Sequence, residues 1–214
     1  MLDKEVEFPL YKVVSSPGNG FYEEKKSRFI AQIVPADSEE AAVCFIESVR
    51  KKYYDARHNC MAFVIGSNRQ ITRCSDDGEP GGTAGKPILE VLLGAGVTNA
   101  AAVVTRYFGG TLLGTGGLVR AYTQAAQEAL QNAGISVMRY GIKLTVGADY
   151  TDVSKIQYLF SCKQIEITDS RYTDKVEFDI RIPAEQKESL KKELTQVTSG
   201  RARITVTGEG YYMA

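Results

Sequence analysis

Hydrophobic and polar residues alternate along several short stretches of the first 137 residues, and a period of two is typical of strands with one buried face. A run of apolar, β-branched residues that begins at position 100 predicts a further strand. Polar and glycine-containing turns separate these stretches. The strands predicted in this region are 20–25, 28–34, 60–65, 70–74 and 100–107.

Three segments between or after these strands have the spacing of helices. The first begins after Ser38, a capping residue followed by two glutamates, and its apolar residues recur every three or four positions. The second is a short helix over 88–93. The third is a strong helix over 118–132, and Gly134 supplies its C-terminal stop.

Beyond residue 141 the pattern becomes more regular, in the order strand, helix, strand, strand, helix, strand. This order is that of the ferredoxin-like fold. We therefore predict an α+β protein of two domains. An α+β domain covers 1–137, a ferredoxin-like βαββαβ domain covers 138–214, and the division falls within 135–141.

The 214 residues carry 26 basic and 26 acidic side chains, so the net charge is zero. This composition excludes binding of nucleic acid through a general basic field, and such a partner would need a local patch. The N-terminus shows no apolar signal core, and the longest near-apolar stretch, 88–97, is too short to span a bilayer. We expect a cytoplasmic protein without a membrane partner.

The chain has one histidine, His58, and four cysteines that form no C-x-x-C pair. The cysteines, Cys44, Cys60, Cys74 and Cys162, are interpreted as free thiols in a reducing compartment. A zinc site usually draws on clustered cysteine and histidine, so we expect no metal and no cofactor. Cys60 and Cys74 are interpreted as core thiols, because the sequence shows no base that would activate them.

Nine of the twenty glycines fall in two segments, 75–87 and 105–120. Such density favours left-handed backbone or the close approach of a partner. The second segment leads into a helix, whose free N–H groups and positive dipole end favour an anion. We therefore predict a surface that binds phosphate or nucleic acid, formed by Lys86, Arg106, Gly109, Gly110, Thr111, Gly114, Thr115, Gly116, Gly117 and Arg120.

A structural explanation fits the same residues equally well: the glycines form a tight turn that packs helix on sheet, and the arginines pair with acids. Neither segment matches a nucleotide-binding motif. The Walker A pattern would need a glycine at Pro80 and Ser or Thr at Pro87, and the dinucleotide fingerprint would need a glycine at Val119. These departures disfavour an ordinary nucleotide hydrolase or a Rossmann dehydrogenase.

The acidic residues of the first segment have two interpretations. Asp76, Asp77 and Glu79 can hold Mg²⁺ together with substrate phosphates. They can instead form a solvated turn or pair with Arg73 and Lys86, and we favour this second interpretation.

A Ser-His-Asp triad is a further possibility, with His58, Ser75 and either Asp76 or Asp77, if the fold brings them together. No G-x-S-x-G motif supports it. We therefore favour a structural or contact role for His58 and assign no catalytic residue.

Three stretches of the chain, 57–60, 75–87 and 105–117, match the signature of a known family. Through them the chain resembles the bacterial, YigZ-type branch of the IMPACT family, over nearly its whole length. The motif residues of these stretches are His58, Asn59, Ser75, Asp76, Asp77, Gly78, Glu79, Gly82, Thr83, Gly85, Tyr107 and Phe108.

The resemblance implies a first domain like the second domain of a small-subunit ribosomal protein. It implies a C-terminal domain similar to the ferredoxin-like domains of the translocating elongation factor. It also implies an association with nucleic acid or the translation machinery. Eukaryotic members regulate translation under amino-acid starvation with the help of an N-terminal RWD domain, which this sequence does not include, so that role does not transfer directly.

The leading hypothesis is a non-enzymatic cytoplasmic regulator that binds RNA, the ribosome or a translation factor through the glycine-rich surface. Tyr107 and Phe108 are candidates for stacking on bases, and as aromatic residues at a strand end they fit a core position equally well. One alternative is an enzyme that acts on a phosphorylated small molecule or nucleotide. The other is a protein–protein adaptor.

Overall fold

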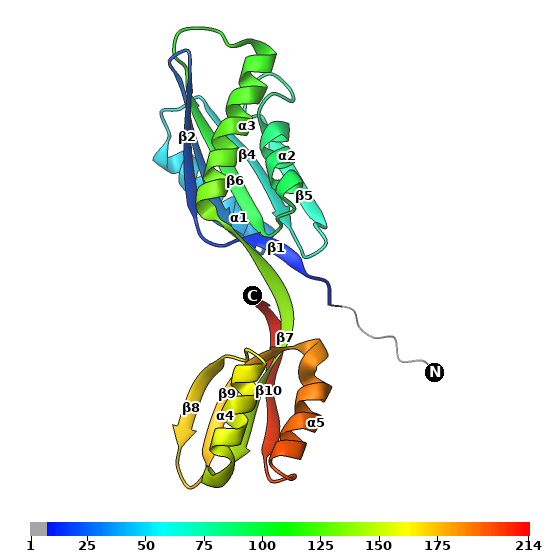
Figure 1. Cartoon of the computed structure of the whole chain (residues 1–214). Helices are drawn as coiled ribbons and strands as arrows, with labels where there is room; N and C mark the ends of the chain where they lie inside the picture. The colour runs from blue at the N-terminus through cyan, green and yellow to red at the C-terminus, as the bar shows by residue number, and fades with distance from the viewer. Residues whose placement is uncertain (1–7) are drawn as a thin grey trace, which may run out of the picture. The chain divides into compact units, whose positions relative to one another are not determined.

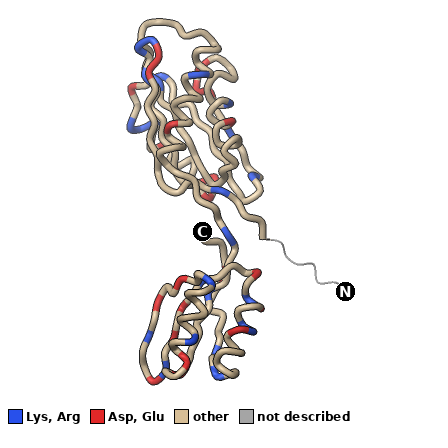
Figure 2. Tube along the Cα trace, viewed as in Figure 1, with Lys and Arg blue, Asp and Glu red and all other residues tan. Residues whose placement is uncertain are grey.

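The computed structural model describes residues 8–214, which form two compact units. The N-terminal unit is Tyr11–Val137, and the C-terminal unit contains 138–214 together with residues 8–10. Basic and acidic residues are interspersed along the chain of both units (Figure 2). No helix of the described residues is long and apolar enough to cross a membrane.

The N-terminal unit is built on a five-stranded sheet in which every neighbouring pair is antiparallel. Its strands, in spatial order, are β2 (Gly18–Glu24), β3 (Ser27–Pro35), β6 (Ala100–Tyr107), β4 (His58–Ile65) and β5 (Ile71–Ser75). All five coincide with predicted strands to within two residues. The short strand β1 (Tyr11–Val14) was not predicted, since four residues are too few to show a period.

Helices cover both faces of this sheet (Figure 1). The helices α2 (Gly85–Ala95) and α3 (Gly114–Ala133) share a core with one face, and α1 (Glu39–Lys52) shares a second core with the other. Alternate residues of β6 enter the two cores, so this central strand is buried on both sides. A sheet packed in this way fixes the ends of β4 and β6, where the candidate site lies.

Local sequence signals predicted the start of one of the three helices of this unit correctly. The hydroxyl of Ser38 accepts a hydrogen bond from the N–H of Ala41 at 3.2 Å, so α1 begins where the capping signal predicted. The predicted starts of the other two helices were wrong: α2 begins at Gly85 rather than 88, and α3 at Gly114 rather than 118. Glycine disfavours helix by about 1 kcal/mol per residue, and contacts from elsewhere in the fold override that preference here.

The C-terminal unit has the predicted ferredoxin-like topology. Its four strands pair antiparallel in the order β8, β9, β7, β10, and β1 also pairs with β7. The α+β class with a ferredoxin-like second domain is confirmed. The elements are β7 (Ile135–Ala148), α4 (Val153–Cys162), β8 (Ile167–Tyr172), β9 (Val176–Pro183), α5 (Lys187–Val197) and β10 (Arg203–Met213), with single 3₁₀ turns at Tyr150–Asp152 and Ala184–Gln186. The predicted junction segment, 135–141, lies within β7.

One face of this second sheet packs on α4 and α5, and charged groups of β8 and β9 that lie outside that core pair with one another. The guanidinium of Arg171 donates to the carboxylates of Asp169, Glu177 and Asp179, the last at 2.5 Å. These ion pairs hold the pKa of the Asp179 carboxyl below its ordinary value, with help from the hydroxyl of Thr145. These charged groups are engaged with one another, and we place the candidate site in the N-terminal unit.

Candidate functional site

A cleft of about 880 Å³ opens at the end of the N-terminal sheet, where β4 begins and β6 ends. His58 and Arg106 are directly opposed in the antiparallel pairing of these strands, so their side chains emerge on the same face. The start of α3 closes the other side. The lining residues are Asp55, Arg57, His58, Glu79, Pro80, Arg106, Tyr107, Phe108, Leu112, Leu113, Gly114, Thr115 and Leu118.

The floor of the cleft contains a buried ion pair. Nη1 of Arg106 donates to Oε1 of Glu79 at 2.7 Å, and the hydroxyl of Tyr122 donates to the same oxygen at 2.9 Å. The guanidinium also lies over the rings of Phe29 and Phe108, at 5.5 and 5.6 Å. Nε of Arg106 is buried and has no hydrogen-bond partner among the described residues. Arg106 was predicted as a phosphate ligand, with pairing to an acid as the alternative, and the structure shows it buried and paired with Glu79.

Cys60 lies behind this pair, with Sγ 3.0 Å from the carbonyl oxygen of Asp76 and 3.3 Å from the hydroxyl of Tyr122. Burial, with a smaller contribution from the negative charge of Glu79, raises the pKa of the Cys60 thiol to about 12. Burial also raises the pKa of Tyr122. The thiol is therefore protonated at neutral pH and is a core thiol, as predicted. The same prediction for Cys74 was wrong, because Cys74 is exposed.

Asp76 caps α2 from outside the helix. Its Oδ1 accepts from the N–H groups of Ala84 and Gly85, at 3.0 and 2.8 Å, and its Oδ2 accepts from Gly82 at 2.8 Å. Burial raises the pKa of Asp76, and the three N–H donors offset this effect, so the pKa lies below its ordinary value. These bonds explain why α2 begins at Gly85, three residues before its predicted start.

The other acidic groups are also engaged. Asp77 accepts from the N–H of Asn59 at 2.7 Å and lies 3.5 Å from Arg50. The predicted partners of the acidic segment were wrong: Arg73 pairs with Glu39, and Lys86 pairs with Glu90 at 3.9 Å. Specific contacts within the fold, rather than a solvated turn, hold these carboxylates.

The triad that the sequence analysis considered and disfavoured is not assembled. Nδ1 of His58 lies 2.8 Å from the carbonyl oxygen of Asp77, which only accepts, so Nδ1 is the donor of this hydrogen bond. The hydroxyl of Ser75 accepts from the N–H of Asp77 at 3.2 Å and lies outside the residues that line the cleft. His58 is therefore the one histidine in the cleft, without a carboxylate partner.

The start of α3 presents N–H groups that lack a side-chain cap. The N-cap position is Leu113, whose side chain has no hydrogen-bonding atom, and the glycine-rich first turn follows it. Gly114 and Thr115 line the cleft, while Thr111 and Gly116 are exposed beside it. Anions are favoured at such a helix start, because the dipole adds to the free donors.

Gly109 has a packing role, as the structural explanation of the second segment predicted. A Cβ at this position would lie 2.1 Å from the carbonyl carbon of Lys26 and 2.2 Å from the nitrogen of Ser27. Its N–H donates to the hydroxyl of Ser27 at 3.0 Å. Gly110 has a left-handed φ of 89° and open space around it. The backbone conformation of the turn, rather than close packing, therefore favours glycine at this position.

Two predicted cationic residues do not line the cleft. Lys86 is exposed on the first turn of α2, and Arg120 is exposed on the second turn of α3, two residues after Leu118 of the cleft wall.

The remaining motif residues support the walls of the cleft. The hydroxyl of Thr105 donates to Asn59 at 2.7 Å, Thr83 donates to the carbonyl of Pro80 at 2.6 Å, and Gly78 packs on the ring of His58.

Several contributors to the site were not assigned to it from the sequence, among them Asp55, Leu112 and Tyr122. The hydroxyl of Tyr107 donates to Asp55 at 2.7 Å, and this bond raises the pKa of Tyr107 to about 12. Arg57 stands in the family stretch 57–60 but was given no role, and the pairing of β4 with β6 would have pointed to it. No signal in the sequence indicated that Tyr122, on a helical apolar stripe, would contact Glu79.

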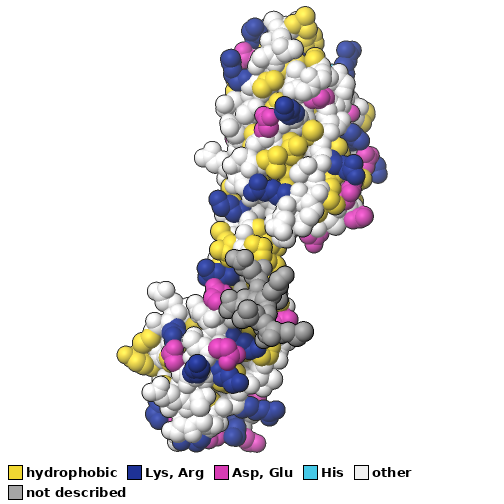
Figure 3. Space-filling view, turned by 90° about the vertical axis from the view of Figure 1, so that its right-hand side faces the viewer, with side chains coloured by type: hydrophobic (Ala, Val, Ile, Leu, Met, Phe, Trp, Pro, Cys, Tyr) yellow, Lys and Arg dark blue, Asp and Glu magenta, His cyan; other side chains and the backbone are white. Residues whose placement is uncertain are grey.

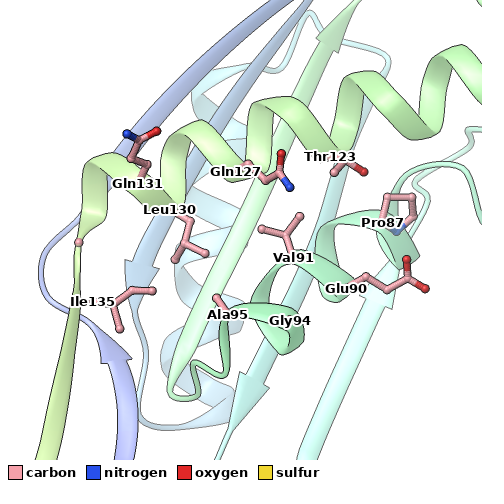
Figure 4. A pocket seen from close by; sticks show the side chains of 11 residues that line it. Pro87, Glu90, Val91, Gly94, Ala95, Thr123, Gln127, Leu130, Gln131 and Ile135 are labelled. Carbon is pink, nitrogen blue, oxygen red and sulfur yellow. The ribbon is translucent and has the colours of Figure 1, made fainter.

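A second concavity lies between α2 and α3, with Val91, Ala95 and Leu130 directed into it (Figure 4). Its volume is about 610 Å³, and Glu90 is the charged residue that lines it. Figure 3, a space-filling view from the α2 side, shows apolar patches on the N-terminal unit interrupted by charges of both signs. The cleft at the ends of β4 and β6 is lined by more ionisable side chains than this concavity, and we take it as the candidate site.

Comparisons with known proteins define the class. The model of the Impact N-terminal domain matches residues 25–130, and that of a Domain of unknown function (DUF1949) matches residues 146–201. The chain is therefore a two-domain protein with an Impact-type N-terminal domain, and the candidate cleft lies in that domain. It belongs to the IMPACT family.

Relatives support this assignment over almost the whole chain. The IMPACT family member YvyE of Bacillus subtilis (strain 168) is 37% identical over 91% of this chain and 89% of its own length. The IMPACT family member YigZ of Escherichia coli (strain K12) is 38% identical over 92% of this chain and 98% of its own length. A crystal structure described as that of a hypothetical protein has 36% identity and a TM-score of 0.61, and the match covers 94% of this chain and 99% of that one.

Proposed function

We propose that the N-terminal unit binds RNA at the cleft between the ends of β4 and β6 and the start of α3, and that the protein is a non-enzymatic, translation-associated cytoplasmic factor. One observation carries the proposal: two sets of unsatisfied donors meet at this cleft. They are the uncapped N–H groups of α3 and the buried guanidinium of Arg106, whose Nε lacks a partner among the described residues. Phosphate oxygens accept from donors of both kinds.

The rim of the cleft suits the other parts of a nucleotide. Phe108 is 55% exposed and Leu112 is 83% exposed, so apolar surface lies beside the anion donors. Stacking of a base on an exposed aromatic ring contributes about 1–3 kcal/mol. Arg57, exposed on the same rim, adds a cation that can contact phosphate.

The engaged acidic groups support binding rather than catalysis. Asp76 caps a helix, Asp77 holds the backbone of β4, and Glu79 neutralises Arg106. The buried, protonated thiol of Cys60 is unsuited to act as a nucleophile. An enzyme that acts on phosphorylated small molecules would have to rely on His58, the histidine that lines the cleft.

The proposal also predicts the affinity for RNA and its dependence on salt. The family resemblance implies an association with translation, and the net charge of zero restricts phosphate contacts to a small patch. We therefore expect modest affinity and a shallow dependence on salt, since each phosphate contact to a single strand adds about 0.7 to the log–log slope.

Fluorescence anisotropy with labelled single-stranded RNA at two salt concentrations tests the proposal. The informative cleft variant is Arg57→Gln with Arg120→Gln, because Arg57 lines the cleft, Arg120 lies just outside it on α3 and both side chains are exposed. A change of Arg106 would instead leave Glu79 buried and unpaired. A matched control removes two exposed cations of the C-terminal unit, Lys191→Gln with Arg203→Gln.

We expect the cleft variant to bind more weakly than the control. Equal binding by wild type and folded cleft variant would remove the cleft from the proposal. If wild type binds no RNA, a nucleotide that raises the thermal unfolding midpoint would instead support the enzyme alternative.

A further inference from the structure

We propose that the turn between β2 and β3, formed by Lys25 and Lys26, is a second contact for the RNA phosphate backbone, next to the cleft. This inference rests on the proposed function and extends its site to residues that no sequence motif indicates. Figure 2 shows basic residues at the end of the β2–β3 hairpin, and Lys25 and Lys26 of this turn are both exposed.

The backbone of the turn is strained by the residues it contains. Glu24 pairs with Ser27, so Lys25 and Lys26 alone form the loop, with φ angles of 48° and 65°. Two successive positive φ angles define a type I′ turn, which Asn-Gly and Asp-Gly adopt most readily. Lysine has no side-chain group that favours this conformation. The stability of the fold therefore does not explain why lysines occupy both positions of the turn.

The turn is fastened to the rim of the cleft. Gly109 packs on the backbone of Lys26 so closely that any side chain would collide with it, and its N–H donates to the hydroxyl of Ser27. Phe108, the preceding residue, lines the cleft. The guanidinium of Arg28 lies 5.0 Å from the centre of the Tyr107 ring, which also lines the cleft. The lysines are therefore held beside the cleft by the glycine-rich segment.

The ammonium groups are available for a ligand. Both lysines are exposed, and within residues 8–214 neither forms an ion pair. The neighbouring acids Glu23 and Glu24 leave the tip with a small positive excess, because Arg28 adds a third cation. A small excess of charge suits an extended anion that is positioned mainly by the cleft, as the phosphate backbone of a single strand would be.

The test separates the charge of the turn from its conformation. In the variant Lys25→Asn with Lys26→Gly, the ideal type I′ pair replaces the lysines, which relieves the strain and removes both charges. We expect its thermal unfolding midpoint to rise. We also expect its affinity for labelled single-stranded RNA to fall several-fold, with a log–log salt slope shallower by about 1.4. The variant Lys25→Arg with Lys26→Arg keeps the charges and should bind like wild type.

A control removes two exposed lysines of α5, Lys191→Gln with Lys192→Gln. Unchanged RNA binding by the Asn-Gly variant, with binding still sensitive to Arg57→Gln, would overturn this inference and leave the cleft intact. An equal loss in the α5 control would overturn it as well, because bulk charge would then explain the effect. Absence of RNA binding by wild type would overturn both proposals.

Discussion

Arg106 and Glu79 form an ion pair of 2.7 Å whose two side chains are only 7% and 3% exposed. The pair joins the end of β6 to the segment before α2, and Tyr122 of α3 donates to the same carboxylate oxygen. A buried pair contributes little net stability, but each charge becomes costly when its partner is removed. The site is therefore more sensitive to the loss of one partner than to the loss of both.

Replacing Glu79 alone should destabilise the N-terminal unit strongly. Glu79→Leu leaves the Arg106 guanidinium buried without its counter-charge, and we expect a loss of about 3–5 kcal/mol in the free energy of unfolding. The double variant Glu79→Leu with Arg106→Met should be less destabilised than this single variant. Urea denaturation measures both, and a double variant at least as destabilised as Glu79→Leu alone would contradict the prediction.

The cap on α2 should make stability depend on pH. The folded-state pKa of Asp76 lies below its ordinary value, so its bonds stabilise the fold fully above the unfolded-state pKa of about 3.9 and are lost as pH falls through the folded-state pKa. At neutral pH, Asp76→Asn should cost about 1 kcal/mol. The difference from wild type should narrow in acid, and a constant difference down to about pH 3 would show that the charge has no role.

Two adjacent glycines should tolerate substitution differently. Gly109→Ala places a Cβ within 2.4 Å of three backbone atoms of Lys26 and Ser27, and we expect a cost of about 2–3 kcal/mol. Gly110→Ala meets open space and pays only for a left-handed φ, about 1 kcal/mol. Thermal and urea unfolding of the two variants compare these costs, and equal stability would argue against the tight contact.

The four cysteines should differ in their reaction with a thiol reagent, according to how exposed they are. Cys44, Cys74 and Cys162 are exposed, whereas Cys60 is buried and burial raises its pKa to about 12. A thiol reagent at neutral pH should therefore label three cysteines of the native protein, and Cys60 only after denaturant is added. Peptide mapping identifies the labelled positions. Fast labelling of Cys60 in the native state would contradict the closed floor of the cleft.

Local patterns predicted the elements well wherever one face of a strand or helix is buried. The run of 100–107 matches β6 residue for residue, and the Ser38 cap marks the start of α1. The starts of α2 and α3 were placed too late, because glycine propensity argues against helix. The first turn of α2 depends on Asp76, whose position in its capping role is set by tertiary structure.

The candidate site was harder to predict than the fold. The glycine-rich second segment was correctly identified as a turn before a helix, and its start contributes Gly114 and Thr115 to the cleft. The burial of Arg106 depends on Glu79, which lies 27 positions away, and on Phe29 of another strand. Pairing of this kind follows from tertiary packing, so the sequence left a phosphate ligand and an arginine paired with an acid as equal alternatives and did not identify Glu79 as the partner.

Photo-crosslinking of 4-thiouridine-labelled single-stranded RNA to the whole chain, followed by peptide mapping, tests most directly whether RNA occupies the cleft. We predict crosslinks in the peptides that carry 55–58 and 107–115, which contain most of the cleft lining. Arg57→Gln with Arg120→Gln should reduce their yield. Crosslinks confined to residues 138–214, or none above those of an unrelated protein, would contradict the proposal.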